Sequence, residues 1–349
     1  MKTKVFIMEE DKIDLEGVAY AANIIKQGGV VAFPTETVYG LGANALDPLA
    51  VKKIFEAKGR PQDNPLIVHV SDKNINNLVD NISSIANNLM EKFFPGPLTI
   101  ILNKKDIIPD ETSAGLKTIG IRMPSNEIAR KLIEFSGVPI AAPSANISGR
   151  PSPTDVNRCI EDLNDRVDCI IGGNNSNVGV ESTIVDCTVE PPCVLRPGGI
   201  TLEQLKQVYN DIYIDPSIMA KPSDNLKPKA PGMKYRHYAP KAPVKIIKGD
   251  LKKTIEKINE IVQNYIDNNK TVGIIATEET RQFYKNGYVV SLGSRKDMNK
   301  IAHNLFETLR SFDDKNVDVI LSEAFDENGI GLAIMNRLNK SAGFHIINV

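Results

Sequence analysis

Residues 15–37 read LEGVAYAANIIKQGGVVAFPTET, and this stretch sets the pattern for the first part of the chain. Its apolar residues first recur at the spacing of a helix, which a pair of glycines ends. Residues 30–33 are then apolar without interruption, as is typical of a short buried strand. The polar residues 34–37 follow where that strand ends. The stretch therefore predicts a helix, a buried strand and a polar strand end, in that order.

The same alternation continues downstream. Helical spacing recurs near residues 51–58 and 85–93. Further short strands are predicted at 66–70, 98–102, 119–123, 138–142, 167–171 and 182–186. Thr201 and Gln204 match a capping box at the start of one more short helix. This order predicts an α/β domain with a partly parallel sheet, in which several strands lie close enough to pair antiparallel.

The composition changes after about residue 210. Residues 211–243 are rich in proline and lysine and show almost no hydrophobic period, which is typical of a linker. The alternation then restarts, with strands predicted at 244–247, 272–276, 289–292 and 317–321. We therefore expect a first domain over 1–210, the linker over 211–243, and a smaller Rossmann-like α/β domain over 244–349.

Composition narrows the function classes. The 349-residue chain has a formal net charge of -1, which argues against whole-surface attraction to nucleic acid or to an acidic membrane. Its four cysteines form no C-x-x-C pair and its four histidines show no H-x-x-x-H spacing, so we expect free thiols and no structural zinc. Neither a signal-peptide pattern nor an apolar run of about 20 residues is found. We expect a cytoplasmic protein with no membrane contact and weak or no direct nucleic acid binding.

Familiar nucleotide-binding signatures do not explain this chain. Residues 40–45, GLGANA, fit G-x-G-x-x-A after a strand, but the next helix begins only near Pro48, too late for a dinucleotide loop. We expect these glycines to form a tight turn near the pocket instead. No G-x-x-x-x-G-K-[ST] loop is present, so this is not a P-loop enzyme, and a G-x-S-x-G elbow is also absent.

Cations and hydroxyl or amide side chains gather at the predicted strand and helix ends. The central ones are Lys58, Arg60, Arg122, Ser144 and Asn146. Each alone has an ordinary structural reading, as a helix cap or a turn residue. Together they combine a point charge, bidentate forks and oriented donors, which is the mixture that phosphate recognition requires. Because ligands bind at strand ends in open α/β sheets, we predict an anion pocket there.

Several motifs, in this order along the chain, resemble the YrdC family in its long two-domain form. They are PTETVYGL (34–41), KGRP (58–61) with NPL (64–66), PGPLT (95–99), PSANISG (143–149), ESTIVD (181–186), LRPG (195–198) and PGMKYRHYAP (231–240). The resemblance spans essentially the whole chain. It implies a twisted mixed sheet with helices and a concave cationic pocket, together with the Rossmann-like second domain.

Members of that family are threonylcarbamoyl-AMP synthases. The resemblance therefore implies a nucleotidyltransferase that forms L-threonylcarbamoyladenylate and pyrophosphate from ATP, L-threonine and bicarbonate or CO₂. Downstream transfer proteins would use the product for N6-threonylcarbamoyladenosine modification of tRNA. Mg²⁺ would accompany ATP as the cofactor, held mainly through the phosphates.

The resemblance also implies a role for individual residues. ATP would contact Lys58, Arg60, Thr118, Ser144, Asn146, Ser152, Arg196 and Tyr238. Of these, the catalytic group would be Lys58, Arg60, Ser144 and Asn146. L-Threonine would lie among Thr35, His69, Arg122, Ala142 and Ser182, with Arg122 as the physically obvious partner of its carboxylate. For His69, a positioning role and a purely structural role remain equal alternatives.

Three further alternatives stay open. Tyr235, Arg236, His237 and Tyr238 lie between proline and glycine segments, which favours a lid that keeps an unstable carbamate from water over a plain spacer. A concave cationic pocket also fits an RNA-binding or ribosome-maturation module, although basic residues are not interleaved with aromatic ones as stacking on bases requires. A carbamoyltransferase of the hydrogenase-maturation type would share the fold, but its cysteine-rich zinc modules are missing here.

Overall fold

A computed structural model of the protein describes residues 2–173, 175–220, 228, 230–231 and 237–349. The chain divides into two compact units. The first contains residues 1–148 and 152–234, and the second contains residues 149–151 and 235–349. The domain boundaries expected at residues 210 and 243 stay predictions.

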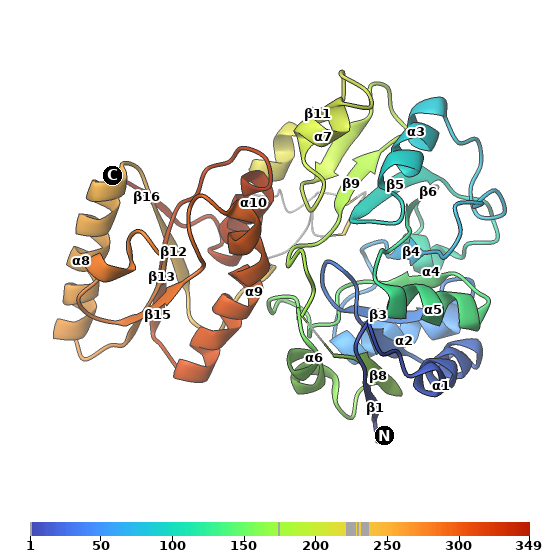
Figure 1. Ribbon diagram of the computed structural model, residues 1–349, viewed down its shortest axis with the longest axis horizontal. Coiled ribbons are helices and arrows are strands. Elements are labelled where there is room, and N and C mark those ends of the chain that lie inside the picture. Colours follow the sequence, from blue (N-terminus) through green and yellow to red (C-terminus); the bar gives the residue numbers. More distant parts are fainter. Residues whose placement is uncertain (1, 174, 221–227, 229, 232–236) are drawn as a thin grey trace. The chain divides into compact units, whose positions relative to one another are not determined.

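The first unit is built, in its described part, on an eleven-stranded mixed sheet (Figure 1). In spatial order the strands are β1 (Lys4–Ile7), β8 (Cys169–Gly172), β2 (Val31–Phe33), β3 (Gly40–Asn44), β7 (Ile140–Ala142), β4 (Ile67–His69), β6 (Thr118–Arg122), β5 (Leu98–Asn103), β9 (Thr183–Asp186), β10 (Cys193–Arg196) and β11 (Tyr213–Ile214). Parallel pairs such as β4–β6 alternate with antiparallel pairs such as β4–β7. The predicted partly parallel α/β sheet is therefore confirmed.

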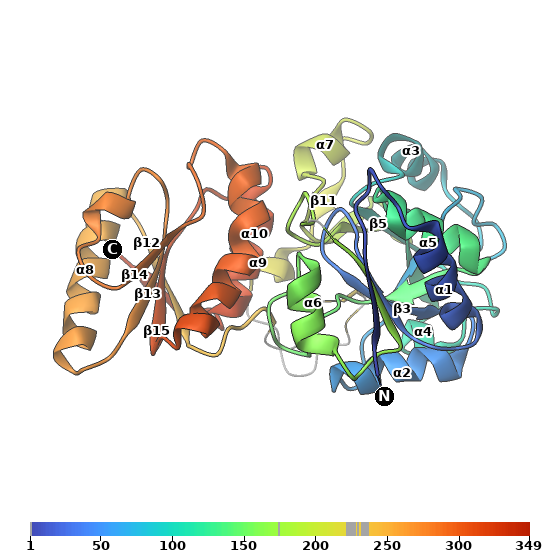
Figure 2. The same ribbon diagram turned by 60° about the horizontal axis from the view of Figure 1, so that its bottom comes forward.

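Helices cover both faces of this sheet. They are α1 (Leu15–Lys26), α2 (Pro48–Lys58), α3 (Ser84–Phe93), α4 (Asp110–Ser113), α5 (Glu127–Ser136), α6 (Val156–Leu163) and α7 (Leu202–Lys206), followed by the short 3₁₀ helix η1 (Pro216–Met219). On one face α1 and α5 pack together over Phe33 and Ile140 (Figure 2). A larger apolar cluster on the other face joins Leu41 and Val68 to α2, α3 and α6. The site residues described below depend on this two-sided support.

Helix α2 brings Lys58 to its position through two local signals. Asp47 caps the helix start by accepting hydrogen bonds from the backbone N–H groups of Leu49 and Ala50. Gly59 ends the helix at a φ of 60°, in the left-handed region that glycine enters without a Cβ clash. The chain therefore leaves the helix directly after Lys58.

The two glycines at positions 40 and 42 do not form the tight turn expected from the sequence. They lie in β3, which pairs antiparallel with both β2 and β7. A Cβ on Gly42 would come within 2.6 Å of Ile140 Cγ2 and 2.7 Å of Phe33 Cε1. These glycines are therefore needed because neighbouring side chains cross the strand closely, and not because the chain turns there.

The second unit contains a parallel sheet, five-stranded within the residues described. Its order is β14 (Tyr288–Ser291), β13 (Val272–Ala276), β15 (Val319–Glu323), β12 (Val244–Lys248) and β16 (Ile346–Asn348). Helix α8 (Leu251–Asp267) covers one face, whereas α9 (Met298–Lys315) and α10 (Gly331–Ser341) cover the other (Figures 1 and 2). The short helix η2 (Arg281–Phe283) precedes β14. This is the Rossmann-like arrangement that the sequence predicts.

Part of the expected linker is packed against the first unit. Strand β11 pairs in parallel with β10, and Ala230 is fully buried in an apolar cluster that includes Ile67 and Ile184. Tyr235 and Arg236, two of the residues expected in a lid, lie outside the described residues.

Two expectations from composition can be compared with the structure. All four cysteines are free thiols, as expected, and three of them are buried. None of the helices in the described ranges combines the length and apolar character that a membrane crossing requires.

Candidate active site

The first cluster of site residues joins the end of α2 to the loop after β7. Lys58 is 2% exposed, and its Nζ donates hydrogen bonds to the carbonyl oxygens of Ser144 and Asn146. The Ser144 hydroxyl donates to Asn146 Oδ1 at 2.5 Å. These two contacts fix the position of the ammonium against the loop after β7. The cluster therefore brings a buried cation, a hydroxyl and an amide together, which are groups of the kind that bind an anion.

The second cluster surrounds Arg122 at the end of β6. Its Nη2 donates to Glu36 Oε1 at 2.7 Å, to Thr37 Oγ1 at 2.9 Å and to Thr35 Oγ1 at 3.4 Å. The arginine side chain is 5% exposed, and its Nε has no hydrogen-bond partner among the described residues. A buried N–H without a partner is rare in folded proteins. Arg122 therefore retains a donor that a carboxylate ligand could satisfy.

His69 lies beside Arg122, because β4 and β6 pair with these two residues in register. Its Nδ1–H donates to the carbonyl oxygen of Ile67 at 3.1 Å, so Nε2 is left as an acceptor. Burial, and next the nearby Arg122 cation, lower the pKa of His69 to about 3. The imidazole is therefore neutral near pH 7, and it suits positioning by hydrogen bonding better than proton transfer.

The third cluster connects β5, β9 and β10. Arg196 donates from Nε and Nη2 to the carbonyl oxygen of Ser182, at 3.1 and 2.9 Å, and from Nη2 to the Ser182 hydroxyl at 3.1 Å. The same hydroxyl lies 2.8 Å from Thr99 Oγ1. A residue expected to contact ATP thus orients one expected to contact threonine. Glu181, which directly precedes Ser182 in the chain, accepts a hydrogen bond at Oε1 from the Ser152 hydroxyl at 2.9 Å.

The structure gives the positions of the remaining predicted residues, but none of the contacts described below joins them to the three clusters. Arg60 lies over the ring of Phe55, 5.8 Å from its centroid. Thr118 and Ala142 lie at the start of β6 and the end of β7. Tyr238 belongs to the second unit, where its ring stacks on Phe306 at 5.0 Å and lies 5.8 Å from the Arg337 guanidinium. Its contact with ATP stays a prediction.

Sheet order explains how residues so far apart in sequence converge. Strands β7, β4, β6, β5, β9 and β10 are consecutive neighbours in the sheet. The register places Ile67 of β4 between Ala142 of β7 and Gly120 of β6. Residues at or next to the ends of these strands belong to all three clusters, and Lys58 and the segment 34–37 contact them from the end of α2 and the end of β2.

Four further residues take part in these contacts and were given no role in the site from the sequence. They are Glu36, Thr37, Thr99 and Glu181, and all lie inside the motifs that carry the family resemblance. Glu36 and Glu181 are only 6% exposed. Both glutamates lie beside other polar residues in the sequence, so only their burial singles them out, because carboxylates are almost never buried without a partner.

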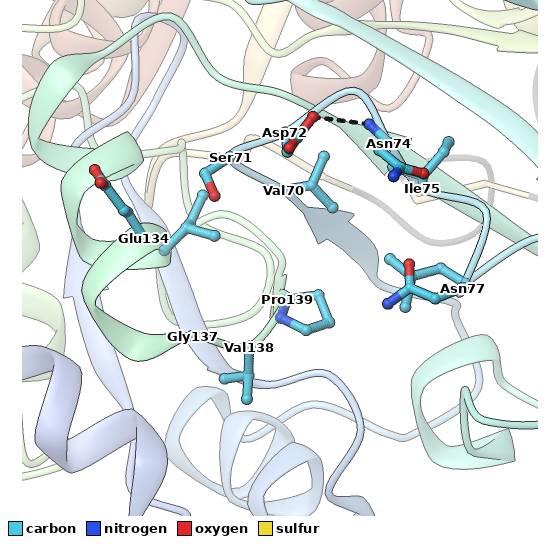
Figure 3. Close-up of a pocket in the computed structure, with 12 residues that line it drawn as sticks. Val70, Ser71, Asp72, Asn74, Ile75, Asn77, Glu134, Gly137, Val138 and Pro139 are labelled. Atoms are coloured by element: carbon cyan, nitrogen blue, oxygen red, sulfur yellow. Dashed lines mark hydrogen bonds between the residues drawn. The ribbon is translucent and has the colours of Figure 1, made fainter.

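A separate hollow of about 310 Å³ opens beyond the end of β4 (Figure 3). Its lining comes from the segment that follows His69 and from the end of α5, and it includes Asp72 and Glu134. None of the predicted site residues lines it. The three clusters above are therefore the candidate active site.

The fold and these clusters define an α/β protein in which buried cations and hydroxyls gather at strand and helix ends. The chain belongs to the Sua5/YciO/YrdC family, whose model, described as telomere recombination, matches residues 23–198. A second model, described as the C-terminal domain of threonylcarbamoyl-AMP synthase, matches residues 200–343. The two-domain form expected from the sequence motifs is thereby confirmed.

Relatives match the chain over its full length. A threonylcarbamoyl-AMP synthase from Pyrococcus abyssi is 48% identical over 99% of both chains. One from Bacillus subtilis is 47% identical over 99% of this chain and 100% of its own. The crystal structure of P. abyssi Sua5 complexed with L-threonine is 47% identical, covers 100% of both chains and superposes with a TM-score of 0.93.

Proposed function

We propose that this chain is a threonylcarbamoyl-AMP synthase, a nucleotidyltransferase that joins L-threonine, bicarbonate or CO₂, and ATP. The observation that carries the proposal is the match to synthases over the full length of both chains, at 47–48% identity. The L-threonine complex of the P. abyssi protein supports threonine as the amino-acid substrate. The site also meets a physical requirement of this reaction, because it combines an arginine N–H donor that a carboxylate could use with a separate lysine cluster.

The two clusters divide the substrates between them. Arg122, with its unpartnered Nε, would receive the threonine carboxylate, and Ser182 would contact the same substrate. Lys58 and the Ser144–Asn146 loop would face the phosphates of ATP. His69, neutral and with Nε2 as an acceptor, would take a hydrogen bond from threonine.

The reaction needs positioning more than covalent catalysis. The neutral threonine amine adds to CO₂ and loses a proton, which gives N-carboxy-threonine. An oxygen of that carboxylate then attacks the α-phosphorus of ATP, and the bond to the bridging oxygen breaks as pyrophosphate leaves. Because two anions approach each other, a preorganised cation such as Lys58 stabilises the charge that develops.

Mg²⁺ would supply further charge neutralisation on the phosphates. Within the described residues no group of three or more histidine, cysteine, aspartate or glutamate side chains could hold a metal ion. This donor set fits an ion that ATP itself holds and that the protein contacts little. Delivery of the product to downstream proteins that modify tRNA, and a location in the cytoplasm, stay predictions.

Mass spectrometry of the products formed from ATP, threonine and bicarbonate tests the proposal. We expect threonylcarbamoyl-AMP and pyrophosphate in equal amounts, and loss of the adenylate when bicarbonate and dissolved CO₂ are removed. Absence of the adenylate under full conditions would refute it. An RNA-binding module would instead show no turnover and an RNA affinity that falls steeply with salt, which a titration at two salt concentrations measures.

A further inference from the structure

Glu36 is a buried carboxylate in a site that must attract anions. It follows β2 in the segment 34–37 and is 6% exposed. A negative charge here repels both a triphosphate and an amino-acid carboxylate. Its presence therefore requires a compensating role, which neither the sequence motifs nor the family match assigns.

Both carboxylate oxygens and the carbonyl oxygen of Glu36 accept hydrogen bonds from the protein. Oε1 accepts from Arg122 Nη2 at 2.7 Å, and Oε2 accepts from the backbone N–H of Ser125 at 3.1 Å. Its carbonyl oxygen accepts from the backbone N–H of Val178 at 2.8 Å. A carboxylate fixed through both oxygens is poorly placed to collect a proton from a substrate. These contacts instead make Glu36 a rigid anchor.

The anchored group is one nitrogen of Arg122. Thr37 Oγ1, at 2.9 Å, and Thr35 Oγ1, at 3.4 Å, accept from the same Nη2. The guanidinium is planar and its donors form a fixed fork, so holding Nη2 also sets the direction of the other two nitrogens. In the described part of the chain, Nε has no hydrogen-bond partner. The protein therefore holds the guanidinium by Nη2 and leaves its other nitrogens for a ligand.

We propose that Glu36 is a positioning residue, which holds Arg122 by Nη2 so that the remaining guanidinium donors meet the carboxylate of the amino-acid substrate. The inference rests on the proposed function for the identity of that substrate. Two other roles make different predictions. If Glu36 only tunes charge, its removal strengthens the attraction of Arg122 for a carboxylate. If it only supports the fold, its removal affects both substrates alike.

The test replaces Glu36 with alanine and measures both substrates separately. For Glu36→Ala we expect the KM for L-threonine to rise about tenfold or more, whereas the KM for ATP changes less than about twofold. Glu36→Gln, which keeps one acceptor oxygen, should lie between this variant and the unchanged protein. A fall or no change in the threonine KM overturns the proposal, and so does an equal rise for both substrates.

A second pair of variants tests the same role in case Glu36→Ala fails to fold. Thr37→Val removes another acceptor of Nη2 at nearly constant volume, and Thr37→Ser restores the hydroxyl as its matched comparison. We expect Thr37→Val to raise the threonine KM about threefold and Thr37→Ser to recover most of that loss. Equal values for the two variants contradict the anchor.

Calorimetric titration with L-threonine alone separates the two proposals. If the unchanged protein binds threonine but forms no adenylate, the proposed function fails. In that case the proposed role of Glu36 is supported if Glu36→Ala weakens threonine binding about tenfold, and it is wrong if the binding is unchanged. If the unchanged protein forms the adenylate and Glu36→Ala binds threonine normally, only the anchor fails.

Discussion

Both units place an arginine–glutamate pair at the end of a strand, and the two pairs are built differently. In the first unit Arg122 gives only Nη2 to the protein, and Glu36 is its ionic partner. In the second unit Arg295 gives Nη2 to Glu323 and both Nη1 and Nη2 to the carbonyl oxygen of Ala324. Among the residues that the structure describes, neither arginine has a hydrogen-bond partner for Nε, so the difference lies in Nη1.

The carboxylates differ as well. Glu36 takes its second hydrogen bond from a backbone N–H, whereas the fully buried Glu323 takes one from the Tyr284 hydroxyl at 2.6 Å. We call the second pair closed, because side chains and the local backbone use both terminal nitrogens of Arg295. We call the first pair open, because the described residues hold Arg122 by Nη2. The comparison teaches that an arginine–glutamate pair is a candidate for ligand binding when Nη1 of the arginine, as well as Nε, is not used by the described residues.

The largest effect should come from breaking the closed pair. Glu323→Ala leaves Arg295 without its carboxylate and should lower the free energy of unfolding by about 3 kcal/mol, measured by chemical denaturation. Glu327→Ala, which removes only an exposed partner of Lys248, should cost less than about 1 kcal/mol and is the matched control. If Glu323→Ala instead raised the threonine KM, the contrast between the two pairs would be wrong.

The next effect concerns the lysine cluster of the first unit. Lys58→Ala removes a cation and also the two hydrogen bonds that hold the Ser144–Asn146 loop, so kcat/KM should fall about 100-fold, roughly 2.7 kcal/mol. Lys53→Ala is the control on the same helix, because Lys53 donates only to the carbonyl oxygen of Gly28. Activity near normal in Lys58→Ala would remove Lys58 from the reaction site.

The stability of the protein should also depend on pH through His69. Its pKa is about 3 in the folded protein, below the ordinary value of 6.5, so the unfolded chain binds a proton first as the pH falls. The stability that the neutral imidazole contributes is therefore complete above pH 6.5. It should be lost by about 1.4 kcal/mol per pH unit as the pH falls from there toward 3.

Replacing the imidazole isolates this contribution from that of the carboxylates. The unfolding free energy of His69→Gln should depend less on pH than that of the unchanged protein between pH 6.5 and pH 4. Parallel pH profiles for the two proteins would contradict a neutral, buried His69.

The smallest effect sharpens the description of the closed pair. Tyr284→Phe removes one hydroxyl that donates to Glu323 and should lower the unfolding free energy by about 1 kcal/mol. Threonine and ATP kinetics should stay unchanged in this variant. A loss as large as that of Glu323→Ala would mean that the tyrosine, and not the arginine, is the main partner of the carboxylate.

Much of the fold could be predicted, because many of its helices and strands follow from local patterns in the sequence. Helical spacing predicted α1 and α2, an unbroken apolar run predicted β2, and the Thr201–Gln204 capping box is present as expected. Strand β3 escaped prediction because its sequence, GLGAN, has no β-branched or aromatic residue. Its pairing with two neighbours and the crossing of Phe33 make it a strand.

The candidate site could be predicted in part. Lys58, Arg122 and Ser144 were identifiable as polar groups at strand or helix ends, and the motifs added Ser182 and Arg196. The role of Glu36 was not visible, because nothing in the segment 34–37 shows which of its side chains turns inward. Arg196 was expected to contact ATP; the structure adds that its Nε and Nη2 donate to Ser182, and its contact with ATP stays a prediction.

The sequence by itself determined the order of helices and strands, the caps that end them, and the chemical types available to the site. It did so because these properties depend on neighbours a few residues apart. Only the tertiary structure decided which groups meet. Glu36 and Arg122 are 86 residues apart in the chain, as are Lys58 and Ser144. Their contacts follow from strand order in the sheet, which no local pattern encodes, and that order decides which donor stays open to a ligand.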